Sequence, residues 1–154
     1  MPDYRERLWA TPWMFIVTGL LIPASILVLA PISLPAGIIT GVVLYLGVAG
    51  LLLLASPVVE VSGGELRAAK ASIPLEFTGE AVGFAGTEAS AERGRRLDVR
   101  AFLMIRGWVS DVVRVEIVDP KDPTPYWLIS SRKPNELAAA INGSRRPESS
   151  AGNA

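Results

Sequence analysis

The hydrophobic and polar positions of this chain separate it into an apolar front part and a mixed remainder. No charged residue occurs from Leu8 to Val59, a region that holds two apolar stretches, residues 13–30 and 36–55. A helix rises about 1.5 Å per residue and the hydrocarbon core of a bilayer is about 30 Å thick, so roughly 20 apolar residues span it. Lipid offers no partner to a bare backbone amide, and each stretch should therefore be helical. The pattern predicts a hairpin of two transmembrane helices joined at residues 31–35.

Small and aromatic residues add detail to the predicted hairpin. Pro23 lacks a backbone donor and should kink the first helix. Gly37 and Gly41 lie four residues apart on one face of the second helix, a spacing that lets helices approach closely. Two interpretations of that face stay open: packing against the first helix, or self-association of two copies. Trp9 and Trp13 are predicted to anchor the hairpin at the membrane interface. Because no charged side chain lies in either span, we expect no transport by this chain alone.

Basic residues flank both ends of the predicted hairpin. Arg5 and Arg7 precede it, Arg67 and Lys70 follow it, and the connecting turn has no charge. Because basic residues stay preferentially on the cytoplasmic side, we expect a multi-pass protein of the plasma membrane with both termini in the cytoplasm, residues 1–12 forming an N-terminal flank. We expect no cleavage of a signal peptide, because a proline directly follows the best small-residue site and a second apolar stretch comes next.

The remainder of the chain predicts a small, mainly-β domain over residues 58–143. Short apolar or alternating segments, bounded by turn-forming residues, are typical of strands. Val113, Val115 and Ile117, for example, share one face, and charged residues alternate with them. Residues 87–98 are predicted as a loop with at most one helical turn. The predicted strands are residues 58–61, 65–68, 71–75, 81–84, 101–105, 112–118 and 126–130.

One amphipathic helix is predicted to close this domain. Pro134 suits its first position, and an Asn-Gly pair suits its end. Leu137, Ala140 and Ile141 share one face of it. Residues 144–154 are small and polar and are predicted to be disordered. Six or seven meandering strands closed by a helix indicate a bent sheet or a barrel capped at one end.

Composition narrows the classes of function. The chain has 154 residues, with 15 basic and 15 acidic side chains and a net charge of zero. We expect no nucleic-acid partner, because such binding needs a basic face. The chain has no Cys and no His, which excludes thiol and imidazole metal sites, Ser-His triads and Cys-His pairs. No glycine motif that cradles phosphate occurs. We therefore expect no cofactor and no enzymatic activity, although carboxylate chemistry stays open.

Two groups of basic residues are candidate lipid contacts. Arg93, Arg95 and Arg96 fall in the predicted loop, and Arg132 and Lys133 precede the final helix. One interpretation is a solvated loop and a charged helix start. The other is contact with anionic headgroups, to which each basic group near the membrane surface contributes about 1 kcal/mol. Both interpretations stay open at the level of sequence.

Acidic residues gather at two places. Glu116, Asp119 and Asp122 suggest a carboxylate metal site, but the prolines between and after the two Asp residues favour a stiff turn. Glu60 and Glu65 are predicted to face each other across a β-hairpin. An acid–base pair also needs a pocket, which no motif indicates. We therefore predict no metal and no catalytic residue.

Several segments resemble known families. The pattern of residues 62–67, followed by residues 73–75 and ending in a strand that runs into the final helix at residues 127–137, resembles bacterial pleckstrin-homology-like domains. The chain from Tyr4 to Ile141 resembles a family of actinobacterial membrane proteins catalogued as a domain of unknown function. Its most specific parts are Thr124-Pro125-Tyr126-Trp127 and the helix start Arg132-Lys133-Pro134-Asn135-Glu136-Leu137. That resemblance implies a two-helix membrane protein with a cytoplasmic domain, and it supplies no activity, cofactor or catalytic residue.

These features predict a membrane protein that presents a small binding domain at the cytoplasmic surface, for a protein partner or for anionic lipid. Two alternatives stay open. One is an accessory subunit of a larger membrane complex that packs through Gly37 and Gly41. The other is an enzyme that acts on lipid or envelope precursors through carboxylates.

Overall fold

The computed structural model describes residues 3–145 and divides the chain into two compact units. One unit is a helical hairpin, Trp9–Pro57. The other is a β domain, built from the residues up to Leu8 together with those from Val58 onward. The predicted disordered tail overlaps the last helix at residues 144 and 145, and its remainder lies outside the described residues.

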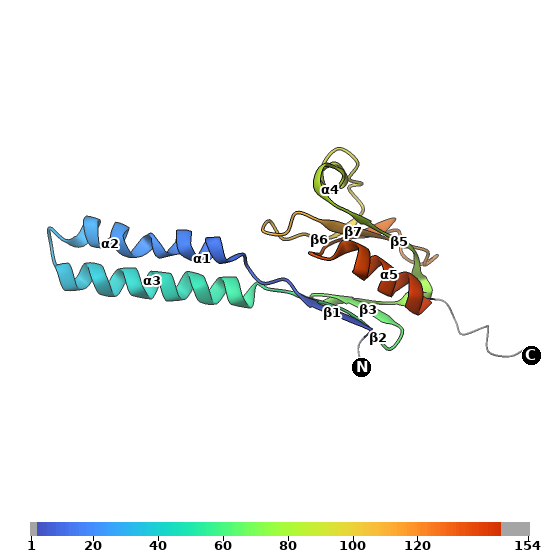
Figure 1. Ribbon diagram of the computed structural model, residues 1–154, viewed down its shortest axis with the longest axis horizontal. Helices are drawn as coiled ribbons and strands as arrows, with labels where there is room; N and C mark the ends of the chain where they lie inside the picture. The colour runs from blue at the N-terminus through green and yellow to red at the C-terminus, as the bar shows by residue number, and fades with distance from the viewer. Residues whose placement is uncertain (1–2, 146–154) are drawn as a thin grey trace, which may run out of the picture. The chain divides into compact units, whose positions relative to one another are not determined.

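Three helices form the hairpin unit (Figure 1): α1 (Pro12–Gly19), α2 (Leu21–Leu29) and α3 (Leu34–Leu54). Pro12 lies in the first turn of α1, where a missing N–H breaks no helical hydrogen bond. The break at Leu20 lies just before Pro23, whose ring prevents the ordinary hydrogen bond to the carbonyl of Gly19. The helical segment is therefore interrupted at Leu20, between α1 and α2, and the kink expected from Pro23 stays a prediction.

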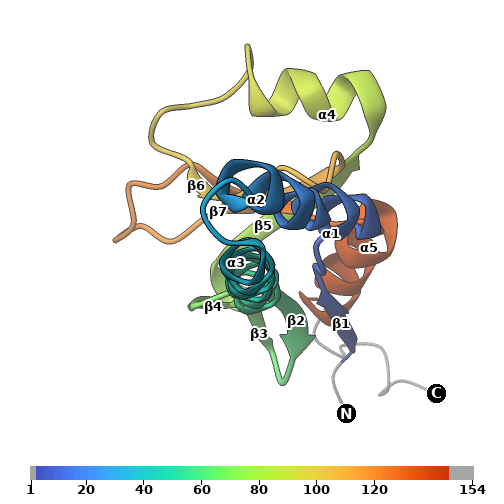
Figure 2. The same cartoon turned by 90° about the vertical axis from the view of Figure 1, so that its left-hand side faces the viewer.

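Helix α3 packs along α2 through its two spaced glycines (Figure 2). A Cβ atom added to Gly37 would lie 3.0 Å from the Cα atom of Ile26. At Gly41 the added Cβ would lie 2.8 Å from the Cα atom of Ile22. Since the neighbouring atoms belong to backbone, neither helix accommodates a larger residue there without moving apart.

Most large apolar side chains of the hairpin unit point away from its interior. In α3 the buried residues are glycines, Gly37 and Gly41, and α1 and α2 bury none. Leu54 is 85% exposed and Ile32 82%. Two segments, Pro12–Leu29 and Leu34–Leu54, are long and apolar enough to cross a membrane.

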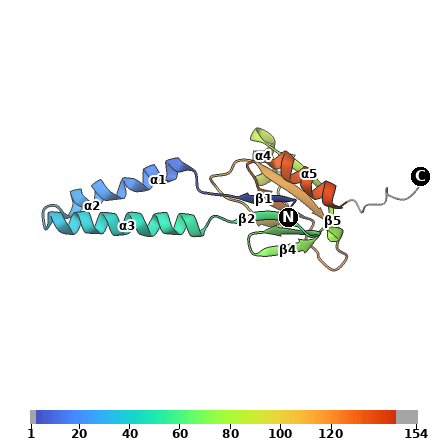
Figure 3. The same cartoon turned by 60° about the horizontal axis from the view of Figure 1, so that its bottom comes forward.

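The first of two four-stranded sheets in the β domain has the order β1-β2-β3-β4, with antiparallel neighbours (Figure 3). The turn between β2 and β3 has left-handed Gly63 and Gly64, the backbone that a two-residue hairpin turn requires. Its strands are β1 (Tyr4–Arg7), β2 (Val58–Ser62), β3 (Glu65–Ala68) and β4 (Ala71–Pro74), followed by the 3₁₀ turn η1 (Leu75–Phe77).

Strand β1 was not predicted from the sequence. It lies in the segment interpreted as an N-terminal flank, residues 1–12, and it pairs with β2 so that Tyr4 faces Val61 and Arg7 faces Val58. Its side chains alternate between partly buried and exposed, but only Tyr4 among them is substantially apolar. The pairing partner therefore determines this strand more than its own residues do.

The second sheet has the order β5-β7-β8-β6 and is mixed. Strand β6 runs parallel to β8, while the other pairs are antiparallel. The predicted meander is therefore wrong at β6, which lies beside the last strand in the sequence. The described residues contain eight strands, whereas six or seven were predicted. Those of this sheet are β5 (Thr78–Phe84), β6 (Phe102–Met104), β7 (Val112–Ile117) and β8 (Tyr126–Ser130).

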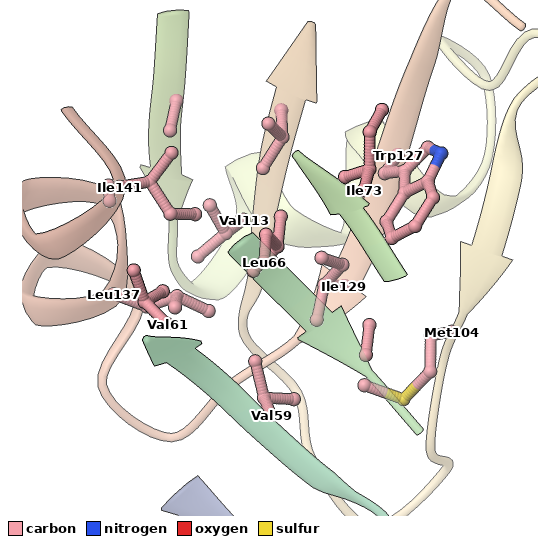
Figure 4. Packing of buried hydrophobic residues seen from close by; sticks show 14 of the residues in the cluster. Val59, Val61, Leu66, Ile73, Met104, Val113, Trp127, Ile129, Leu137 and Ile141 are labelled. Carbon is pink, nitrogen blue, oxygen red and sulfur yellow. The ribbon is translucent and has the colours of Figure 1, made fainter. Parts of the chain in front are cut away.

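The main core lies between the two sheets and the last helix, α5 (Pro134–Arg145) (Figure 4). Leu137 and Ile141 of α5 are fully buried, which confirms the predicted apolar face. Gly83 in β5 allows α5 to approach, because an added Cβ would lie 2.8 Å from the carbonyl carbon of Pro134. Buried partners from the strands are Val59, Val61, Leu66, Ile73, Met104, Val113, Val115, Trp127 and Ile129.

A second, smaller core covers the other face of the second sheet. Helix α4 (Gly86–Arg93) supplies Ala89, which packs with Val112, Tyr126 and Leu128. The predicted loop at residues 87–98 is therefore wrong for its first half, where two helical turns form. Strand β8 is buried at all of its residues because both faces of its sheet are covered.

Candidate functional site

The chain passes from the β domain to the hairpin unit after Leu8 and returns to it at Val58. At this end of the β domain, four segments that are distant in sequence come together. We call it the exit end and define it by Leu8, Val58, Ala69 and Trp108. The amide of Ala69 donates to the carbonyl of Val58 at 3.0 Å. The indole Nε1 of Trp108 donates to the carbonyl of Leu8 at 3.3 Å. The β3–β4 turn and the segment after β6 are thereby fixed to the strand ends that continue into the hairpin unit.

A cavity of about 410 Å³ opens beside these segments, between the edge strands β4 and β6. Two basic residues, Lys70 and Arg106, line it, and none of its lining residues is acidic. The rest of its lining is apolar: Ala68, Ala69, Ala71, Phe102, Leu103 and Met104. The cavity therefore combines cationic groups with an apolar wall, an arrangement suited to an amphipathic anion. We call it the β4–β6 pocket.

The backbone holds both basic residues of the β4–β6 pocket in place. Lys70 follows Ala69, the only residue other than glycine with a left-handed backbone among those that the structure describes, at φ 58°. That conformation costs a residue with a Cβ atom roughly 1–2 kcal/mol. The amide of Arg106 donates to the Ser130 hydroxyl at 2.9 Å, and its guanidinium Nη1 donates to the carbonyl of Ile105 at 3.0 Å.

The predicted basic group at residues 93–96 does not form a single patch. Arg93 is partly buried, and its Nη1 donates to the carbonyl of Val109 at 3.4 Å. Arg96 donates to Glu88 at 2.8 Å, and the Glu88 carboxylate raises the pKa of this guanidinium. Arg95 is exposed. Two of the three arginines thus already serve the packing of α4.

Glu92 is a buried carboxylate that the sequence analysis missed. Its side chain is 2% exposed and lies between Arg96, 3.3 Å from Oε1, and Arg114, 3.6 Å from Oε2. The Arg114 guanidinium in turn stacks 4.6 Å from the centroid of the Tyr126 ring. These contacts fasten α4 to the second sheet. The four-residue spacing of Glu88, Glu92 and Arg96 is the helical signal that the sequence offered.

The predicted basic pair at the start of α5 joins the first strand to the helix. The amide of Arg132 donates to Oε1 of Glu6 at 2.9 Å. The hydroxyls of Ser131 and Tyr4 donate to Oε2 of the same carboxylate, at 2.6 and 2.8 Å. Burial is the main cause that raises the pKa of Tyr4. Lys133 lies 3.3 Å from Glu136 in an exposed ion pair.

The acidic residues Asp119 and Asp122, which follow β7, accept hydrogen bonds within a turn. Asp119 accepts from the amide of Lys121 and Asp122 from the amide of Thr124, each at 2.9 Å. Hydrogen bonding from Thr124 lowers the pKa of Asp122. Within residues 3–145 no group of three or more metal-binding side chains gathers.

Glu60 and Glu65 do not face each other, so that prediction is wrong. Glu60 lies opposite Arg67, and Glu65 lies opposite Ser62. The β2–β3 register differs from the expected one because the turn consists of Gly63 and Gly64 alone. Hydrogen bonds from Ser72 and from Arg67 lower the pKa of Glu65.

Among the candidate residues of the hairpin, the two glycines lie in a helix contact, and the role of the two tryptophans at a membrane interface stays a prediction. Gly37 and Gly41 face the backbone of α2 in the same hairpin, as one of the two interpretations requires. Trp9 is 47% exposed and Trp13 is 58% exposed.

The fold defines a class of protein in which two apolar helical segments, Pro12–Leu29 and Leu34–Leu54, come in the sequence between the first two strands of a small domain. That domain has two four-stranded sheets and a C-terminal helix. A family model described as a protein of unknown function, DUF3093, matches residues 3–141, and the chain belongs to that family. The comparisons with curated proteins and with solved structures found no match.

Proposed function

We propose that this chain is an integral membrane protein whose helical hairpin holds a binding domain at the membrane surface. The observation that carries the proposal is the inverted burial of the hairpin, with glycines inside and large apolar side chains outside. Apolar surface in water costs about 25 cal/mol per Å². Bilayer hydrocarbon removes that cost, and the two segments are long enough to cross it.

The proposed orientation places both ends of the hairpin on the cytoplasmic side. Arg5 and Arg7 precede the first span, Arg67 and Lys70 follow the second, and the connecting residues carry no charge. An excess of basic residues close to a span favours the cytoplasmic side. The β domain then lies in the cytoplasm, next to the anionic inner leaflet of the plasma membrane.

Short connections suit the proposed role of the hairpin as an anchor. Only residues 8–11 separate β1 from α1, and residues 55–57 separate α3 from β2. An extended residue spans at most about 3.6 Å, so both connections keep the exit end near the bilayer. A domain restricted to a surface meets surface-bound partners at a raised effective concentration. We also propose that the β domain is pleckstrin-homology-like, since its end, β8 followed by α5, resembles the end of such bacterial domains.

The two alternatives gain less from the structure. An accessory subunit that packs through Gly37 and Gly41 would have to displace α2, which already covers that face. An enzyme that acts on envelope precursors through carboxylates gains no support from the β4–β6 pocket, because both of its ionisable lining residues, Lys70 and Arg106, are cationic.

Two experiments on the full-length protein in cells test this proposal. After alkaline carbonate extraction, we expect the protein to stay in the membrane pellet. A cysteine introduced at Ser33 should react with an impermeant maleimide from outside, because the chain has no other cysteine, whereas one at Ser144 should react only after permeabilisation. Release by carbonate would overturn membrane insertion, and labelling of Ser144→Cys from outside would overturn the orientation.

A further inference from the structure

We infer that the β4–β6 pocket binds the phosphate-bearing headgroup of an anionic lipid. This inference rests on the proposed membrane anchoring and names the ligand of the domain. The pocket has a volume of about 410 Å³, which lies within the range of small-molecule sites.

Charge selects an anion for the pocket. Lys70 and Arg106 are its only ionisable lining residues, and both are cationic. A phosphate oxygen between an ammonium and a guanidinium accepts short, charge-assisted hydrogen bonds from both. The bond from Arg106 Nη1 to the carbonyl of Ile105 sets the position of this guanidinium at the rim.

The apolar wall of the pocket favours a lipid over a free phosphate. Phe102, Leu103 and Met104 of β6 line it, and Leu103 is 45% exposed. The Phe102 ring lies 4.6 Å from the ring of Trp127, so the wall is continuous with the main core. The glycerol and first acyl carbons of a lipid can cover this surface, whereas inorganic phosphate leaves it in water.

The two-residue turn between β3 and β4 requires a left-handed residue, Ala69, and this turn carries Lys70. Of the four residues with left-handed backbones in the described chain, Ala69 alone carries a Cβ atom. Strain of this kind persists where the surrounding structure enforces it, and it clusters at binding sites. Here the turn places Lys70 on the rim of the pocket.

Position separates this pocket from the basic groups that the sequence suggested. The amide of Ala69, beside Lys70, bonds to Val58, the first residue of the strand that follows the hairpin. A lipid headgroup can therefore reach the pocket while its acyl chains stay in the bilayer. Arg93 and Arg96, in contrast, are bonded within the α4 region.

The test uses full-length protein in neutral detergent, titrated calorimetrically with dihexanoyl phosphatidic acid. Dihexanoyl phosphatidylcholine and inorganic phosphate are titrated in parallel. We expect saturable binding of the phosphatidic acid, and weakening by at least about tenfold in the double variant Lys70→Gln/Arg106→Gln. The matched control, Arg95→Gln/Arg132→Gln, removes the same charge elsewhere and should change the affinity by less than about twofold.

A third variant tests the apolar wall. Leu103→Ala should weaken phosphatidic acid by about threefold and leave any binding of inorganic phosphate unchanged. Near-ultraviolet circular dichroism checks that each variant is folded. Because Lys70 is exposed on a turn, Lys70→Gln alone serves if the double variant fails to fold, with an expected weakening of about threefold.

Each other outcome overturns the inference. Equal weakening by the matched control would show diffuse attraction of charge. Inorganic phosphate that binds as tightly as the lipid, with no effect of Leu103→Ala, would make the site one for free phosphate. A lack of saturable binding would leave the pocket without this ligand. Because the titration is done in detergent, these outcomes are independent of the carbonate and labelling experiments.

Discussion

The helical hairpin and the β domain use apolar residues in opposite ways. In the hairpin unit, Gly37 and Gly41 lie inside while Leu54 and Ile32 are exposed. In the β domain, Leu137 and Ile129 are completely buried while charged residues line the surface. Under the proposed membrane anchoring, each unit is complementary to a different solvent. The two units therefore differ in which apolar side chains they bury, and both contain many such side chains.

The largest expected difference in the free energy of unfolding is between two apolar truncations, one in each unit. Ile129→Ala should lower the free energy of unfolding of the β domain by about 2–5 kcal/mol, because it leaves a cavity in a fully buried site. Leu54→Ala should leave that free energy within about 0.5 kcal/mol. Chemical denaturation followed by Trp fluorescence measures both. Similar losses in the two variants would contradict the contrast between the units.

Next in size is the effect of removing the buried carboxylate of α4. Glu92→Gln takes the negative charge from between Arg96 and Arg114, and should lower the free energy of unfolding by about 1–3 kcal/mol. Glu88→Gln, at an exposed partner of Arg96, should cost less than about 1 kcal/mol. The same denaturation assay compares the two, and an equal cost would mean that burial of Glu92 contributes nothing.

Alanine substitutions at two glycines of α3 distinguish the effect of helix packing from the effect of helix propensity. Gly41→Ala should destabilise helix pairing by about 1–3 kcal/mol, because its Cβ would lie 2.8 Å from the Ile22 backbone. Gly47→Ala meets no atom within 4 Å and should gain up to about 1 kcal/mol from helix propensity. Thermal unfolding in detergent, followed by far-ultraviolet circular dichroism, measures both signs. Two changes of the same sign would refute packing through this face.

The smallest effect is expected at the strained turn of the β domain. Ala69→Gly relieves a left-handed backbone that costs roughly 1–2 kcal/mol but adds about 0.5–1 kcal/mol of chain entropy to be lost on folding. The net gain in stability should be about 0.5–1 kcal/mol by denaturation. The exposed Ala139→Gly, inside α5, should instead lose about 1 kcal/mol, and a loss at Ala69 as well would remove the argument from strain.

The sequence predicted those helices and strands whose own residues show apolar periodicity and are bounded by turn residues. The strands at residues 65–68 and 126–130 and the helix that begins at Pro134 appear where apolar spacing and turn residues place them. Strand β1 and the parallel pairing of β6 could not be predicted in this way. Both segments are short, at Tyr4–Arg7 and Phe102–Met104, and their partners lie far away in the sequence.

Helix α4 shows a related limit. Its sequence, from Gly86 to Arg93, is small and polar and has little apolar periodicity. Burial of Ala89 and the ion pairs of Glu92 stabilise it, and both depend on the second sheet. Tertiary contacts therefore decide this segment.

The β4–β6 pocket could not be predicted from the sequence either, because tertiary contacts form it. Lys70 entered the sequence analysis only as a flanking charge for membrane orientation, and Arg106 did not enter it at all. The antiparallel β3–β4 turn and the parallel β6–β8 pair place both residues on one cavity. The arginines that cluster in the sequence, Arg93 and Arg96, are bonded in the packing of α4.

The pairing of β1 with β2 has a consequence for biosynthesis. Tyr4–Arg7 is synthesised before the two apolar segments, but its neighbour in the sheet begins at Val58, after both of them have been made. In the proposed membrane protein, the first strand therefore stays unpaired until both apolar segments have been made and inserted. Pairing of β1 with β2 then requires both ends of the hairpin to be on the same side of the bilayer. Insertion of one span alone would put the two strands on opposite sides and prevent the β domain from closing.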